Sequence, residues 1–286
     1  MSKRKRRQHH TRSWEASGGS PSSETTAARQ PQRGRRLALI GAALLAVAIP
    51  VAALAGFLLL APGTDETPDT PRAVIVDQLG LTFPNPGFVQ RATGLLEQAG
   101  YQVDYVPGEQ ATVSLYSTLA SRSYDYVLLR VHTAQFTKEW RGLPHDEAVL
   151  FTSEPYSPEI YLYEQWELLL SQAYAYEGAP RYFGVAANFV ESAMPGDFDG
   201  ATVIMMGCGG LYTDRTAEAF MQRGAGVVLG WDQLVSANHT DRATERLLEK
   251  LLVDGLPIDA ALAQTMAEVG RDPAYQSTLL TYPTED

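Results

Sequence analysis

Short apolar runs alternate with segments of helical periodicity along the chain from residue 72 onward. The first run, RAVIVDQLG at residues 72–80, has the nearly uninterrupted apolar character of a strand covered on both faces. The segment 87–100 instead repeats its apolar residues at helical spacing and ends at Gly100. A strand (YQVDYV), a helix (TVSLYSTLASRS) and a further buried strand (YDYVLLRVH) follow. This alternation predicts a parallel sheet covered by helices.

The alternation lapses between residues 133 and 200, where the sequence indicates a strand or hairpin at 148–163, a helix at 163–176 and a strand or loop at 180–190. It then returns. The expected elements are a strand at 201–207, a helix at 214–223, a strand at 224–231, a helix at 240–253, a helix between Pro257 and Gly270, and a final edge strand at 277–283. The prediction is one α/β domain, residues 72–286, with a mostly parallel sheet of about six strands and helices on both faces.

The chain before residue 72 has a different character. Residues 1–36 are basic and rich in Ser, Gly and Pro, so they bury too little apolar surface to order and are predicted to form a disordered tail. Residues 37–61 are 25 residues without a charge, enough for a helix to cross ~30 Å of hydrocarbon. A cleaved signal peptide is the alternative, because Ala53–Ala55 would suit a signal peptidase. The run exceeds the ~7–15 residues of a signal core, which favours a retained transmembrane helix followed by a linker at 62–71.

Charge predicts orientation and partners. Residues 1–36 contain ten Lys and Arg against two Asp and Glu, which leaves 13 against 31 for the rest of the chain. Positive residues remain cytoplasmic, so the tail is expected inside and the acidic domain outside, with the lipid bilayer contacted through residues 37–61. An acidic outer domain argues against a nucleic-acid partner. A single cysteine excludes any disulfide within the chain.

Two chemically capable residues follow predicted strands. His132 closes YDYVLLRV, and Cys208 follows ATVIMMG. Ligands bind at the carboxyl ends of strands in open parallel sheets, so neighbouring strands would bring imidazole and thiol to one edge. An imidazole can take the proton of a thiol and produce the nucleophilic thiolate. The flanking Gly207 and Gly209 would let a substrate carbonyl approach and leave backbone N–H groups for an oxyanion.

A structural interpretation of the same residues stands beside the catalytic one. A free cysteine commonly packs as a small hydrophobe, and a lone histidine at a strand end is commonly a hydrogen-bonded packing residue. An α/β-hydrolase order of Cys208, Asp232 and His239 is also available, but Met206 occupies a position where the nucleophile elbow has glycine. The five histidines show no metal-binding spacing, and no cofactor motif is present.

Around these residues the chain resembles the caspase-like cysteine peptidases, in particular their CHAT-domain branch. The resemblance rests on a strand ending in His, a strand ending in Cys, and RGAGVVLGW followed by paired helices; it covers roughly residues 72–268. It implies a caspase-like fold that hydrolyses a peptide bond without a cofactor, acting on a peptide or protein substrate. By this likeness His132 is the base or imidazolium partner and Cys208 the nucleophile.

The resemblance also implies an oxyanion hole and a substrate pocket. Backbone N–H groups near Cys208 and at Thr133 and Ala134 would form the hole, although the family usually has glycine directly after the histidine. Asp232, just after Trp231, is the candidate for the substrate pocket. Our expectation is a membrane-anchored caspase-like cysteine peptidase. The alternative is an inactive caspase-like domain that serves as a cell-surface binding or scaffold module.

Overall fold

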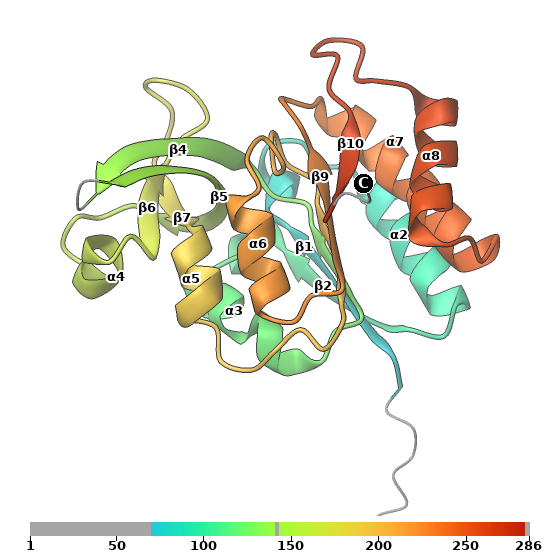
Figure 1. Ribbon diagram of the computed structural model, residues 1–286, viewed down its shortest axis with the longest axis horizontal. Coiled ribbons are helices and arrows are strands. Elements are labelled where there is room, and N and C mark those ends of the chain that lie inside the picture. The colour runs from blue at the N-terminus through green and yellow to red at the C-terminus, as the bar shows by residue number, and fades with distance from the viewer. Residues whose placement is uncertain (1–69, 141–142, 284–286) are drawn as a thin grey trace, which may run out of the picture. The chain divides into compact units, whose positions relative to one another are not determined.

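The computed structural model describes residues 70–140 and 143–283 (Figure 1). Backbone contacts separate Met1–Asp65 from Glu66–Asp286, and every described residue belongs to the second unit. The predicted tail at 1–36, the predicted transmembrane helix at 37–61 and most of the linker at 62–71 lie outside the described residues. Within the described ranges, no helix has the length and apolarity needed to cross a bilayer.

The main sheet has six strands in the order β10-β9-β8-β3-β1-β2, and all neighbours are parallel except the edge pair β9 and β10. This confirms the predicted mostly parallel sheet of six strands. Its strands are β1 (Arg72–Asp77), β2 (Gln102–Pro107), β3 (Tyr126–Leu129), β8 (Thr202–Met205), β9 (Val227–Trp231) and β10 (Leu279–Tyr282).

Helices cover both faces of this sheet, as predicted (Figure 1). Alternate strand residues enter two separate apolar clusters: Ile75 and Leu128 pack with one helical layer, and Val74 and Leu129 pack with the other. The first layer contains α2 (Pro86–Gln98), α7 (Ala237–Leu248) and α8 (Ile258–Val269), and the second contains α3 (Val113–Thr118), α5 (Ala187–Ser192) and α6 (Arg215–Gln222).

Helix boundaries follow the cap residues of the sequence. Asn85 accepts a hydrogen bond from the N–H of Phe88 at the start of α2, and Gly100 follows the helix with φ +94°. Helix α8 begins after Pro257 and ends before Gly270. Helix α7 begins at Ala237, earlier than predicted, and continues into the π-helical turn η4 (Glu249–Val253). Three short 3₁₀ helices connect other elements: η1 (Gln78–Leu81), η2 (Gly108–Gln110) and η3 (Leu119–Arg122).

The region of weak periodicity forms a second, antiparallel sheet, which the sequence analysis did not foresee. Its order is β4-β5-β7-β6, with β4 (Thr133–Trp140), β5 (Leu143–Pro155), β6 (Leu170–Ala173) and β7 (Tyr182–Val185). The helix predicted over 163–176 is wrong. Helix α4 covers only Leu162–Trp166, because Leu168 adopts a left-handed conformation with φ +52° and the chain then pairs with β7 as β6.

Candidate functional site

His132 and Cys208 leave the main sheet at the same edge. Strands β3 and β8 are neighbours, their last paired residues are Leu129 and Met205, and each candidate lies three residues further along its chain. Gly207 allows this close course, because a Cβ at that position would collide with the carbonyl oxygen of Val131. The structure therefore brings together the two strand ends that carry the predicted catalytic pair.

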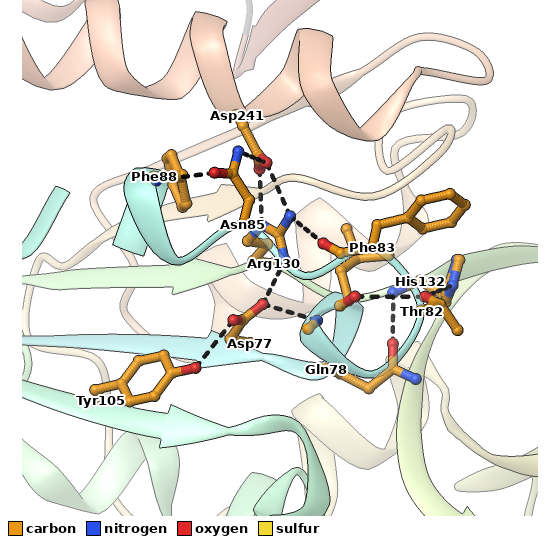
Figure 2. Close-up of polar contacts among 12 residues, drawn as sticks. Asp77, Gln78, Thr82, Phe83, Asn85, Phe88, Tyr105, Arg130, His132 and Asp241 are labelled. Atoms are coloured by element: carbon orange, nitrogen blue, oxygen red, sulfur yellow. Dashed lines mark hydrogen bonds and ion pairs between the residues drawn. The ribbon is translucent and has the colours of Figure 1, made fainter. Parts of the chain in front are cut away.

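The His132 side chain contacts the loop that follows β1. Its Nε2 lies 2.9 Å from the hydroxyl of Thr82, and its backbone N–H donates to Oε1 of Gln78 at 2.9 Å (Figure 2). The ring also packs against Phe83 and Phe151, with ring centroids 6.0 and 5.6 Å apart. Burial, and secondarily the positive charge of Arg130, lowers the pKa of His132. The imidazole is therefore neutral at physiological pH.

The Cys208 thiol lies half-buried against the segment that follows β9. Its Sγ is 3.5 Å from both the backbone N and the carbonyl O of Val235. Burial raises the pKa of Cys208; the N–H of Val235 opposes this shift and the Asp272 carboxylate adds to it. The resting sulfur is thus a protonated thiol that donates weakly to the Val235 carbonyl.

Neither candidate side chain is hydrogen-bonded to the other in the described part of the chain. His132 bonds to Thr82, and Cys208 contacts Val235. The pair is therefore a neutral imidazole and a neutral thiol at one sheet edge, not a preformed imidazolium–thiolate ion pair. A direct proton transfer between them would need a hydrogen bond that neither side chain makes in this structure.

A buried ion network is centred on Arg130, two residues before His132, and the sequence analysis missed it. Arg130 is fully buried and binds Asp241 through two hydrogen bonds of 2.7 and 2.8 Å. The same guanidinium binds Asp77 at 2.5 Å and donates to the carbonyl of Phe83 at 2.8 Å. The sequence indicated this network only through Arg130, a cation within one apolar strand run, and Asp77, an acid at the end of another such run.

This network fixes the loop that holds His132. Asp77 accepts from the N–H of Gly80 at 3.0 Å within η1, while Arg130 anchors the carbonyl of Phe83 (Figure 2). Gln78 and Thr82 are the two residues that bond to His132. Gln78 directly follows Asp77, and Thr82 directly precedes Phe83, so both are next to residues that the network holds. The charges of Asp77 at the end of β1, of Arg130 just after β3 and of Asp241 in α7 therefore set the position of the imidazole indirectly.

A cleft of about 830 Å³ opens between the second sheet and the turn at Cys208. Cys208 and Gly209 line one side, and Thr133 and Ala134 at the start of β4 line another. His132 is not among the lining residues. Amide and phenol side chains contribute much of the remaining wall: Gln135, Gln172, Gln233, Tyr156, Tyr174 and Tyr212.

The predicted oxyanion donors differ in their availability. The N–H of Gly209 donates to the carbonyl of Gln233 at 2.7 Å, whereas the N–H of Cys208 has no acceptor among the described residues. The N–H of Phe151 donates to the carbonyl of His132, so ladder alternation turns the N–H of the next residue, Thr133, away from β5. Ala134 pairs with Val149 of β5 and Gly209 already donates to Gln233, so of these N–H groups those of Cys208 and Thr133 remain available. Gly207 lies against Val131 and Thr133, between the two strand ends.

The predicted substrate-pocket residues lie away from the cleft. Trp231 is fully buried, donates to the Thr240 hydroxyl at 2.9 Å and packs against His239. Asp232 accepts from the N–H of Thr278 at 2.8 Å beside β10. The two residues that follow, Gln233 and Leu234, line the cleft instead.

The alternative hydrolase trio is not assembled. The Nε2 of His239 lies 3.2 Å from the carbonyl of Gly270, and the ring faces Trp231 rather than Cys208. Among the described residues, no group of three or more His, Cys, Asp or Glu side chains could hold a metal ion.

Comparison with known proteins adds no assignment to this geometry. No family model and no curated protein matches the chain.

Proposed function

We propose that the domain is a caspase-like cysteine peptidase in which Cys208 attacks a peptide carbonyl and His132 transfers the protons. The observation that carries this proposal is the shared position of both residues, three residues beyond paired ends of β3 and β8, with Cys208 on a cleft of about 830 Å³. A thiol and an imidazole at one strand edge beside a peptide-sized cleft suit nucleophilic acyl transfer.

The neutral resting pair favours general-base catalysis. As Sγ of Cys208 bonds to the carbonyl carbon, its proton passes to a ring nitrogen of His132, and the N–H groups of Cys208 and Thr133 stabilise the oxyanion. When the C–N bond breaks, the leaving amine takes that proton. Water then attacks the thioester, gives one proton to His132, and the departing sulfur recovers it as a thiol.

Thr82 is proposed to set the tautomer of His132. Its hydroxyl lies 3.4 Å from the carbonyl of Leu79, to which it donates, and 2.9 Å from Nε2 of His132. A hydroxyl that donates to a carbonyl accepts from the ring, so Nε2 carries the proton and Nδ1 is left to act as base. Thr82 is then a positioning residue, equivalent in role to the third member of a triad.

The test is cleavage of a fluorogenic peptide library by the full chain in detergent. Cys208→Ala and His132→Ala are each expected to abolish cleavage without changing the circular dichroism spectrum. His239→Gln is the matched control, because it alters a histidine outside the cleft, and it is expected to remain active. Cleavage that survives either of the first two substitutions would reject the assigned roles.

A second candidate is a binding module that retains the fold without catalysis. The raised pKa of Cys208 and its bonding to Val235 instead of His132 favour this alternative. Alkylation of the single thiol by iodoacetamide separates the two. A catalytic pair predicts that His132→Ala slows labelling at neutral pH. A binding module predicts that the substitution leaves the labelling rate unchanged and that this rate, plotted against pH, has its inflection above the free thiol pKa of ~8.5.

We also propose that residues 37–61 anchor the domain on the outer face of a membrane. The support is the uncharged run itself and the basic residues that precede it. A retained anchor predicts that the full chain stays in the membrane pellet after alkaline carbonate extraction, with its N-terminal tail intact. A soluble product that begins at Gly56 would instead identify a cleaved signal peptide.

A further inference from the structure

Segment 232–236, which we call the strap, lies beside Cys208 between the end of β9 and the start of α7. The carbonyl of Gln233 accepts from the N–H of Gly209 at 2.7 Å. Further along the strap, the backbone N and O of Val235 each lie 3.5 Å from Sγ of Cys208. The middle of the strap is therefore bonded to the turn that carries the thiol.

Segment 272–278, between α8 and β10, holds both ends of the strap. At one end Asp232 donates its N–H to the carbonyl of Thr278 at 3.1 Å, and its Oδ1 accepts from the N–H of Thr278 at 2.8 Å. At the other end Oδ2 of Asp272 accepts from the N–H of Ser236 at 2.9 Å. The position of the strap therefore depends on segment 272–278.

Asp272 is fully buried, and no cation pairs with it in the described part of the chain. Its Oδ1 accepts from the N–H groups of Ala274 and Tyr275 at 2.8 and 2.9 Å, while Oδ2 accepts from Ser236. Burial alone would raise the pKa of Asp272, but these hydrogen bonds hold it below its ordinary value. The residue is therefore an ionised carboxylate whose charge is stabilised by backbone N–H groups, and the strap supplies one of them.

The charge of Asp272 also acts on the thiol. Burial is the main cause of the raised pKa of Cys208; the N–H of Val235 opposes this shift and Asp272 adds to it. The other titratable groups on the elements beside the thiol are His132, Tyr212 and Asp232. Asp272 thus limits the reactivity of the sulfur in two ways that can be separated, because it holds the strap in place and it disfavours the thiolate.

The strap also forms part of the cleft wall. Gln233 and Leu234 line the cleft, and Leu234 is 54% exposed. The next residue, Val235, is only 7% exposed and is the one that contacts the sulfur. The strap therefore borders both the thiol and the space that a substrate would occupy.

From these contacts we propose that the strap restricts access to the Cys208 thiol and that Asp272 is the positioning residue that holds the strap in place. The inference rests on the proposed function, because it names how access to that same site is controlled. Access to the thiol can be measured without peptide cleavage, so the two proposals can be tested separately.

The experiment measures alkylation of the single thiol by iodoacetamide over a series of pH values, with the full chain in detergent and mass spectrometry as the readout. The inflection of the rate against pH gives the thiol pKa, and the rate divided by the thiolate fraction gives access to the sulfur. Asp272→Asn is the main variant. Its Nδ2 atom only donates, so either the bond to Ser236 or the bonds to Ala274 and Tyr275 are lost. Access is expected to rise about tenfold, as for the loss of a hydrogen bond to a charged group, and the inflection is expected to move to lower pH.

Ser236→Pro tests the strap without changing a charge. It removes the N–H that Asp272 accepts, and the φ of −72° at Ser236 suits proline. Access is expected to rise in this variant too, with a smaller change in the inflection. Asp259→Asn is the matched control, because Asp259 is an exposed acid in the first turn of α8, and it is expected to change neither quantity.

Labelling is repeated in urea below the unfolding transition to separate movement of the strap from loss of stability. Labelling that requires global unfolding rises with the full m of the protein, whereas labelling through local movement of the strap changes little. The inference is overturned if access stays at the wild-type value in both Asp272→Asn and Ser236→Pro, if Asp259→Asn matches their increase, or if the increase shows the full urea dependence. Faster labelling of Asp272→Asn, when the wild-type chain cleaves no peptide, would refute only the peptidase. Cys208-dependent cleavage by a chain whose access does not respond to either substitution would refute only the strap.

Discussion

Removing the Arg130 guanidinium tests whether the buried ion network stabilises the sheet edge that carries His132. Arg130→Met keeps most of the side-chain volume but leaves Asp77 and Asp241, each only 3% exposed, without their cation. Breaking a buried pair in this way costs about 3–5 kcal/mol because a buried charge is left uncompensated. Since domains of this kind unfold with about 5–15 kcal/mol, the variant should lose a large part of its stability.

The assay is urea unfolding of the full chain in detergent, followed by tryptophan fluorescence, with stability taken from the midpoint at constant m. Arg91→Met is the matched control. Arg91 pairs with Glu245 at 2.6 Å, but its side chain is 54% exposed, so its loss should cost less than about 1 kcal/mol.

A compensated variant sharpens the result. Adding Asp77→Asn and Asp241→Asn to Arg130→Met removes the stranded charges, so a substantial part of the lost stability should return. If Arg130→Met costs no more than Arg91→Met, the network does not hold this edge. If the two Asn substitutions restore nothing, the cost lies in packing rather than in uncompensated charge.

Three further results are expected from the same structure. If the domain is the proposed peptidase, Thr82→Val should lower kcat and shift the acid limb of the pH–rate profile, while Thr82→Ser should keep both, because the hydroxyl that lies 2.9 Å from Nε2 is proposed to set the tautomer of His132; an unchanged profile would contradict this role. Burial raises the pKa of Glu147 above 4.5, so native protein binds an extra proton and loses stability as pH rises through the raised value. The urea midpoint of Glu147→Gln should therefore rise relative to that of wild type as pH increases from 4.5 through the raised pKa of Glu147, and a difference that stays constant with pH would refute this. Gly94→Ala in α2, where an added Cβ meets nothing within 4 Å, should stabilise by roughly 0.5–1 kcal/mol, whereas Gly207→Ala should destabilise by about 1–3 kcal/mol; equal midpoints would argue against the close packing at Gly207.

The main sheet could be predicted because burial of a central strand on both faces requires a short, continuous apolar segment in the sequence. The four residues Ala73–Val76 are buried on both faces, so they form a continuous apolar run between turn signals. Helix α8 likewise has Pro257 before it and Gly270 after it. In both cases the decisive interactions are local enough for the sequence pattern to record them.

The second sheet could not be predicted in the same way. The segment Leu168–Ala173 is a short apolar run whose period fits a helix or a strand, and its partner β7 lies further along the chain. The pairing and the left-handed Leu168 decide the outcome, and neither follows from composition. A large part of the cleft wall belongs to this sheet, so the cleft itself was not foreseen.

The sequence allowed us to predict which strand ends carry the candidate site, but not which atoms its side chains contact. Parallel pairing of β3 and β8 places His132 and Cys208 at one edge, as expected from their positions after apolar runs. Their actual partners, Thr82 and Val235, come from loops 50 and 27 residues away in the sequence. A pattern that records burial cannot record which loop atom a particular ring or sulfur will meet.

The protonated state of Cys208 is consistent with the proposed location of the domain. A solitary thiol on the outer face of a membrane meets an oxidising medium, and oxidation acts on the thiolate. Burial against Val235 keeps the sulfur protonated, so it protects the resting thiol while lowering its nucleophilicity. A substrate that displaces Val235 would expose the sulfur only while the acyl group of the substrate is bound beside it. In the proposed peptidase, reactivity would then depend on ligand binding rather than on a permanently ionised dyad, and a neutral resting pair would be compatible with catalysis.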